Sequence, residues 1–137
     1  MAQINAYLNF DGNCREAMAF YKDCLGGDLA LQTVEGSPVA GQMSAEAQKH
    51  ILHAALTKGD LVLMASDMIG SGPVKGNSIA LSLNCSSEEE ISTYFSKLSS
   101  GGQITDPLSE KFWGATFGTL TDKFGINWLL NYEKPKA

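Results

Sequence analysis

Apolar and polar residues alternate along several short stretches of this chain, which is the period of a half-buried β-strand. The alternation is clearest at residues 4–10 near the start and at residues 126–131 near the end. Apolar runs bounded by glycine, asparagine or aspartate predict further strands between them. These strands are expected at residues 28–34, 51–57, 61–66, 78–84, 103–105 and 111–121.

Two other stretches carry apolar residues at helical spacing, and each ends at a Gly-Gly pair. The first contains Phe20-Tyr21 and ends at Gly26-Gly27, and the second contains Tyr94-Phe95 and ends at Gly101-Gly102. The aromatic pairs are 74 residues apart and the Gly-Gly pairs are 75 apart. This spacing indicates that a strand-helix-strand-strand-strand unit occurs twice.

The duplication predicts an α+β protein of two βαβββ modules, residues 1–67 and 77–137, within a single domain 1–137. The glycine-rich residues 68–76 are interpreted as the linker. In each module the helix would cover one face of a curved mixed sheet and leave the other face bare. Two modules set side by side would enclose a cleft between their bare faces, where a ligand is expected.

The closing hairpin, residues 111–132, holds both tryptophans and three of the six phenylalanines. A buried aromatic side chain hides on the order of 150–250 Å², so this hairpin is expected to anchor much of the core. Trp113, Phe117 and Trp128 are therefore interpreted as core residues. The alternative is that some of them wall a ligand pocket.

Charge and cysteine content exclude several classes of function. The net charge is −5 and the ten basic residues are scattered along the chain, which argues against a nucleic-acid partner. No apolar run approaches the roughly 20 residues of a membrane span, and no signal-like segment opens the chain, so a cytoplasmic location without membrane association is expected. The three cysteines form no Cys-x-x-Cys pair, which argues against a disulfide framework or a thiolate zinc site.

His53 is the candidate for proton transfer or ligand contact near neutral pH. It lies in the predicted strand 51–57 on the face opposite Leu52, Ala54 and Leu56, so it points toward the cleft if those three pack on a helix. Asp67, at the end of the next strand, is a candidate to orient the His53 ring. The alternatives are a structural histidine satisfied by a hydrogen bond and an aspartate that opens the linker.

Four small polar residues, Ser78, Ser82, Asn127 and Asn131, fall on strand positions that would also face the cleft. They would give the cleft a neutral hydrogen-bonding surface. Each is equally compatible with an exposed strand position.

Four stretches together resemble the vicinal oxygen chelate superfamily, which includes glyoxalase I, bleomycin resistance proteins and extradiol dioxygenases, and within it the PhnB-like branch. They are INAYLNFDGNCREAMAFYKDCLGG from Ile4, ILHAALTKGDLVLMASD from Ile51, GNSIALSLNC from Gly76 and FWGATFGTLTDKFGINWLLN from Phe112. The resemblance implies paired βαβββ modules, a homodimer, and a site in the cup between modules.

The resemblance also implies where a metal would be held. Enzymes of the superfamily bind one divalent metal through four His, Glu or Gln side chains, one from each of four strands. Carried over, those positions fall at Ala6, Met64, Ser78 and Leu129, none of which is a credible ligand. We therefore expect no metal and no other cofactor. The residues expected to line the cleft are Met64, Ser78, Ser82, Trp113, Phe117, Asn127, Leu129 and Asn131.

Three functions remain open from the sequence. The first is metal-independent binding of a small molecule in the cleft. The second is a lyase, isomerase or transferase in which His53 is the general base or anchors a weak metal site. The third is a chain in which only dimerisation and scaffolding remain.

Overall fold

The computed structural model describes residues 2–35, 41, 44–45, 49–68 and 72–135, and the chain divides into two compact units, Met1–Val74 and Lys75–Ala137. The division falls inside the predicted linker 68–76, of which residues 69–71 lie outside the described part. Each unit is a βαβββ module with a four-stranded mixed sheet, so the predicted α+β fold class is confirmed.

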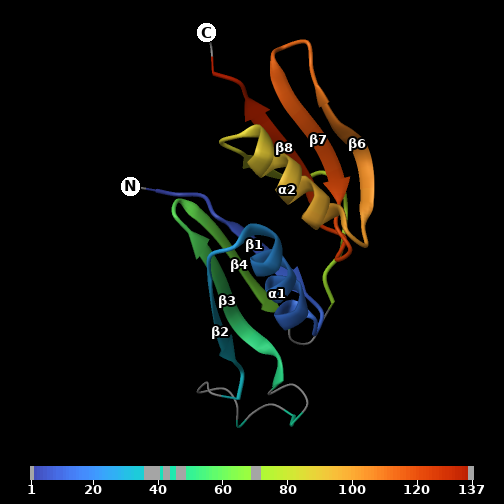
Figure 1. The fold of residues 1–137 in the computed structure, drawn as a ribbon. Coiled ribbons are helices and arrows are strands. Elements are labelled where there is room, and N and C mark those ends of the chain that lie inside the picture. The colour runs from blue at the N-terminus through green and yellow to red at the C-terminus, as the bar shows by residue number, and fades with distance from the viewer. Residues whose placement is uncertain (1, 36–40, 42–43, 46–48, 69–71, 136–137) are drawn as a thin grey trace. The chain divides into compact units, whose positions relative to one another are not determined.

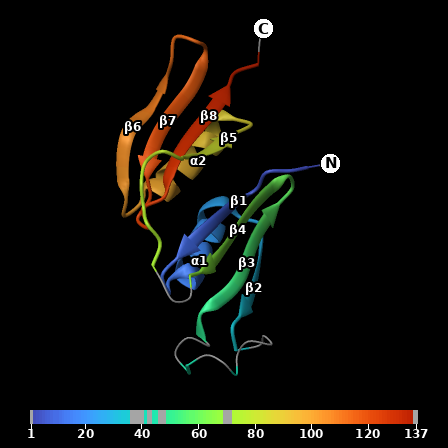
Figure 2. The same cartoon turned by 180° about the vertical axis from the view of Figure 1, so that it is seen from behind.

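The first unit contains β1 (Ala6–Phe10), α1 (Cys14–Leu25), β2 (Asp28–Thr33), β3 (Ile51–Lys58) and β4 (Leu61–Asp67). Its sheet has the strand order β1-β4-β3-β2, in which β1 and β4 are parallel and the other pairs are antiparallel. Helix α1 connects β1 to β2 and lies across one face of this sheet (Figure 1). The opposite face is seen when the molecule is viewed from behind (Figure 2).

The second unit repeats this arrangement with β5 (Leu81–Asn84), α2 (Glu88–Ser99), β6 (Gln103–Glu110), β7 (Ala115–Thr121) and β8 (Asn127–Glu133). The strand order is β5-β8-β7-β6, with β5 parallel to β8, and α2 packs on one face (Figure 1). Register bulges interrupt the pairing of β6 with β7.

Alternating residues of each sheet pack against the helix of the same unit. In the first unit Leu8, Leu56 and Ala65 are buried together with Met18 and Tyr21 of α1. In the second unit the buried set comprises Leu120, Trp128 and Leu130 from the sheet and Ile91, Phe95 and Leu98 from α2. The period-2 and period-3.6 patterns of the sequence therefore meet in one small core per unit.

Helix α2 begins with a capping arrangement around Ser87. The Ser87 hydroxyl accepts a hydrogen bond from the Glu90 N–H at 3.0 Å. The Glu90 carboxylate in turn accepts from the Ser86 N–H at 2.9 Å, so two donors at the helix start are satisfied.

The second glycine of each Gly-Gly pair lies where the chain passes close to the end of another strand. A Cβ at Gly27 would lie 2.5 Å from the Thr57 carbonyl oxygen, and a Cβ at Gly102 would lie 2.9 Å from the Asp122 Cα. Both positions exclude a side chain because backbone already occupies the space. The repeated glycine pair is thus a packing requirement of the module.

Gly118 of β7 is a similar close contact, here with the helix. A Cβ at this position would lie 2.8 Å from Phe95 Cε2 and 3.0 Å from the Asp106 carbonyl oxygen. We expect Gly118→Ala to lower the free energy of unfolding by about 1–3 kcal/mol through overpacking, measured by urea denaturation. Gly76→Ala is the matched control, since no atom lies within 4 Å of the added methyl group. Equal stability of the two variants would contradict the packing described.

Candidate functional site

Each sheet has one face that its own helix does not cover, and we call this the open face of that unit. In β3, Ala54 and Leu56 are fully buried on the helix side, and His53 and Ala55 alternate with them. In β8, Trp128 and Leu130 are buried on the helix side, and Asn127, Leu129 and Asn131 point the other way. The open faces therefore carry most of the residues that the sequence predicted for a ligand site.

His53 lies on the open face of the first unit, where it contacts a residue that the sequence analysis missed. Its Nδ1 is 3.4 Å from the Tyr7 hydroxyl, and the two ring centroids are 5.9 Å apart. Tyr7 is in β1 and His53 in β3, so the pair reaches across β4, which lies between them. Met64 pairs directly with Tyr7 in the parallel ladder, and Gln32 pairs with His53.

The prediction that Asp67 orients His53 is wrong. Asp67 is buried on the helix side of β4, in line with Leu63 and Ala65, and its two oxygens accept hydrogen bonds from the Cys14 N–H at 2.9 Å and the Ile51 N–H at 2.8 Å. The carboxylate therefore satisfies the start of α1, where negative charge is favourable, and ties it to the start of β3. Asp67 and His53 lie on opposite faces of the sheet, and the role of Asp67 is structural.

The N-terminal cap of α1 explains why Asp67 is needed there. Asn13 is the N-cap residue, but its side chain forms no capping hydrogen bond. A carboxylate from the end of β4 takes the place of the local cap. His50, which precedes β3, has a buried Nδ1 without a partner in the described part of the chain.

On the open face of the second unit, five predicted residues come together. Ser82 of β5 pairs with Leu129 of β8, and Phe117 of β7 pairs with Asn131 of β8. Asn127 lies further along the same face of β8, but its amide is already occupied. Its Nδ2 donates to the Gly76 carbonyl at 3.1 Å, and its Oδ1 accepts from the Thr121 hydroxyl at 2.8 Å.

The structure places the other predicted residues of this unit differently. Ser78 precedes β5, which begins only at Leu81, so it is not a strand residue. Trp113 lies in the turn before β7, closed by a hydrogen bond from the Gly114 N–H to the Lys111 carbonyl, and is 51% exposed. The interpretation of Trp113 as a core residue is therefore wrong, whereas Trp128 is confirmed as one.

A shallow depression on the open face of the second unit was not predicted. Its volume is about 260 Å³, and it is lined by Asn84, Cys85, Asn131 and Glu133. Asn84 pairs with Asn131 in the parallel ladder of β5 and β8. Both strands therefore end at this edge of the sheet with their carboxyl ends. The alternation along β8 places Glu133 on the same face as Asn131. The pairing of Asn84 with Asn131 depends on how β5 and β8 align in the sheet, which the sequence pattern does not give.

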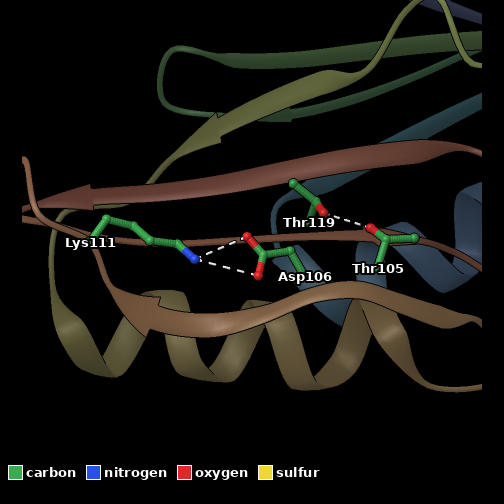
Figure 3. Close-up of polar contacts among 4 residues, drawn as sticks. All are labelled: Thr105, Asp106, Lys111 and Thr119. Atoms are coloured by element: carbon green, nitrogen blue, oxygen red, sulfur yellow. Dashed lines mark hydrogen bonds and ion pairs between the residues drawn. The ribbon is translucent and has the colours of Figure 1, made fainter.

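Polar side chains at the β6 edge of this unit are already paired with one another. Lys111 Nζ lies 3.1 Å from Asp106 Oδ2, and the Thr105 and Thr119 hydroxyls are 2.5 Å apart (Figure 3). The first contact ties β6 to the turn that follows it, and the second joins β6 to β7 where the ladder is irregular. These four side chains are therefore less available to a ligand than the residues of the depression.

The surroundings of two thiols, those of Cys14 and Cys85, disfavour the reactive thiolate. Burial, with a smaller contribution from the Glu90 carboxylate, raises the pKa of Cys85 from 9.0 to about 11, and burial raises the pKa of Cys14 to about 12. At pH 8 only about one Cys85 in a thousand is then a thiolate. We expect Cys85 to react slowly with a disulfide reagent at pH 8, and about tenfold faster for each pH unit up to pH 10. A fast, pH-independent reaction of the folded protein would contradict this.

The fold and the two open faces define a protein of the duplicated βαβββ class. Residues 3–130 match the model of the Glyoxalase/Bleomycin resistance protein/Dioxygenase superfamily, and the chain belongs to this superfamily. It is 34% identical to Protein YjdN of Escherichia coli (strain K12) over 140 residues, which covers 96% of this chain and 95% of YjdN.

Solved structures give the same assignment. Protein PA1353 from Pseudomonas aeruginosa is 39% identical, with a TM-score of 0.86 and coverage of 98% of this chain and 100% of that one. The PhnB protein from Bacillus cereus is 27% identical, with a TM-score of 0.74 and coverage of 96% and 99%. The resemblance to the PhnB-like branch is thereby confirmed.

The residues on the open faces do not fit the divalent metal of the superfamily's enzymes. Ala6 shares the helix side of β1 with Leu8, so the open-face residue paired with Met64 is Tyr7. In the second unit the corresponding pair is Ser82 and Leu129. These four positions therefore offer the phenol of Tyr7, the thioether of Met64, the hydroxyl of Ser82 and the alkyl group of Leu129. Such groups do not make a strong binding site for a divalent metal. In the described residues no group of three His, Cys, Asp or Glu side chains is placed to hold a metal.

Proposed function

We propose that this protein binds a small organic molecule on its open sheet faces, without a metal. The proposal rests on four open-face residues, which lie on the strands that carry the metal ligands in the superfamily's enzymes. These residues are Tyr7, Met64, Ser82 and Leu129. These side chains offer apolar contact and neutral hydrogen bonding in place of metal ligands. Asn131 and Phe117 beside them extend the same neutral and aromatic character.

A second candidate function is an enzyme that uses His53, and the contact of His53 with Tyr7 favours it. If the His53 Nδ1–H donates to the Tyr7 hydroxyl oxygen, the ring is held in one orientation and the unprotonated Nε2 is left to accept a proton from a ligand. Such an arrangement is what a general base on a rigid strand requires. Under this alternative the substrate would contact the open face of the first unit.

Ligand binding with and without a chelator, and with and without the His53 imidazole, tests the binding proposal. A fragment collection is screened by NMR against the metal-free protein and against His53→Ala, with Asp60→Asn in the exposed β3–β4 turn as the control variant. The binding proposal predicts that fragments bind with EDTA present and that His53→Ala leaves the affinity largely unchanged. Fragment binding that appears only after addition of a divalent metal would contradict it.

The alternative function has its own readout. If a reaction is found for a bound fragment, catalysis through His53 predicts that His53→Ala lowers kcat by on the order of a hundredfold or more. Tyr7→Phe keeps the ring but removes the hydroxyl, so it tests the orienting role separately. Unchanged turnover in both variants would exclude the pair from the chemistry.

The homodimer and the cytoplasmic location belong to the same proposal. Light scattering of the purified protein and fractionation of cells test them directly. No helix in the described part of the chain is both long and apolar enough to cross a membrane.

A further inference from the structure

The depression on the open face of the second unit combines unsatisfied acceptors with one charge. In the described part of the chain the side chains of Asn84, Asn131 and Glu133 make no hydrogen bond or ion pair. The adjacent Lys134 pairs with Glu110 at 3.1 Å instead of with Glu133. The Glu133 carboxylate is therefore a charge without a partner. The Cys85 thiol adds no second charge to the depression, because its raised pKa keeps it neutral.

These three side chains match the hydrogen-bonding capacity of an ammonium group. An ammonium has three donors and no acceptor, and the depression offers two amide oxygens and a carboxylate. A carboxylate or phosphate ligand would instead meet Glu133 as a like charge. The net charge of −5 also favours approach of a cation.

An exposed aromatic surface lies next to the depression in the same unit. Asn131 pairs with Phe117 on the neighbouring strand, and the Trp113 and Phe117 ring centroids are 5.9 Å apart with an interplanar angle of 71°. Phe112, which is 97% exposed, packs edge-on against Trp113 at 5.0 Å. Aromatic rings presented in this way are stacking surfaces for a flat ring and favour a nearby cation.

The register sets the distance between the two features. Asn84, Asn131 and Phe117 occupy one row across β5, β8 and β7. Neighbouring strands are about 4.8 Å apart, so the row spans roughly 10 Å. A single small molecule is long enough to contact both ends.

We propose that the open face of the second unit binds a small aromatic amine, with its ammonium group in the depression of Asn84, Asn131 and Glu133 and its ring on Trp113 and Phe117. This inference rests on the proposed function and names the ligand class for one unit. It assigns Asn84 and Glu133 as binding residues, which the strand pattern alone did not.

Four matched probes test the ligand class by NMR titration of the full chain. 2-Naphthylmethylamine carries both features, 2-naphthylmethanol lacks the charge, cyclohexylmethylamine lacks the aromatic ring, and 2-naphthoate reverses the charge. We expect 2-naphthylmethylamine to bind tightest, with shifts at the side-chain amides of Asn84 and Asn131 and at the Trp113 indole. Each of the two single-feature probes should bind roughly tenfold more weakly, and the naphthoate should not bind.

Variants at exposed positions keep the test independent of folding. Glu133→Gln and Trp113→Leu should each weaken 2-naphthylmethylamine binding by roughly tenfold. Glu89→Gln, an exposed carboxylate in the first turn of α2, is the charge-matched control and should leave the affinity unchanged. Retained affinity in Glu133→Gln, or equal binding of the alcohol or naphthoate, would overturn the amine assignment.

The remaining outcomes separate this inference from the proposed function. Binding of another fragment class to the open faces with EDTA present would leave the proposed function standing and overturn the inference. Shifts centred away from Asn131 and Trp113 would also overturn it. If neither the four probes nor any other fragment binds to the protein with EDTA present, both proposals fail.

Discussion

Replacing Asp122 with alanine is expected to lower the free energy of unfolding by about 3–5 kcal/mol, because three donors lose a buried acceptor. Asp122 is only 3% exposed. Its Oδ1 accepts from the Phe124 N–H at 2.8 Å and the Ile126 N–H at 3.1 Å, and its Oδ2 accepts from the Trp128 Nε1–H at 2.8 Å. One carboxylate therefore shapes the β7–β8 turn and anchors the buried tryptophan.

Urea denaturation followed by tryptophan fluorescence measures this effect. Asp60→Asn is the control, since Asp60 is exposed in the corresponding turn between β3 and β4, and we expect a change within about 0.5 kcal/mol. Asp122→Asn should be intermediate, because an amide keeps one acceptor oxygen. A loss below 1 kcal/mol in Asp122→Ala would mean that the three donors find water or other partners at little cost.

Asp67→Ala is the second large effect, with an expected loss of about 2–4 kcal/mol. The substitution leaves the Cys14 and Ile51 N–H groups without the acceptor that both now share, and it removes negative charge from the start of α1. Hydrogen exchange should accelerate most at these two amides, ahead of the rest of the first unit. Asp11→Ala, at an exposed position just after β1, is the control.

The Asp67 variants also test the corrected role of this residue. Asp67→Asn that still folds should leave the NMR signals of the His53 ring nearly unchanged, since the two side chains lie on opposite faces of the sheet. A large shift of the His53 ring signals, without a loss of stability, would restore the catalytic pairing that the sequence predicted.

The strand pattern predicted the open faces well because side-chain direction in a strand follows sequence parity. Ser82, Leu129 and Asn131 share a face for this reason, as predicted. The same parity places Asp67 with Leu63 and Ala65 on the helix side, so the strand pattern of β4 predicts that Asp67 is buried. A charged residue at the end of a strand is usually exposed, and Asp67 departs from this because its carboxylate caps α1.

Other features depend on contacts that parity does not specify. The approach of Tyr7 to His53 requires the strand order β1-β4-β3, which brings together residues 46 apart in sequence. Trp113 was predicted in a strand, but Gly114, with a φ of 91°, closes a turn there and leaves the indole at the surface. The depression at Asn84 and Glu133 likewise follows from the parallel register of β5 and β8.

Metal analysis tests the central claim of metal-independent binding most directly. Protein purified without chelators or a metal-binding tag is analysed for bound metal before and after incubation with zinc, nickel and manganese. The account predicts far less than stoichiometric metal in every condition, and unchanged amide resonances for Tyr7, Met64, Ser82 and Leu129. Near-stoichiometric metal, with shifts at those four residues or around His53, would contradict it.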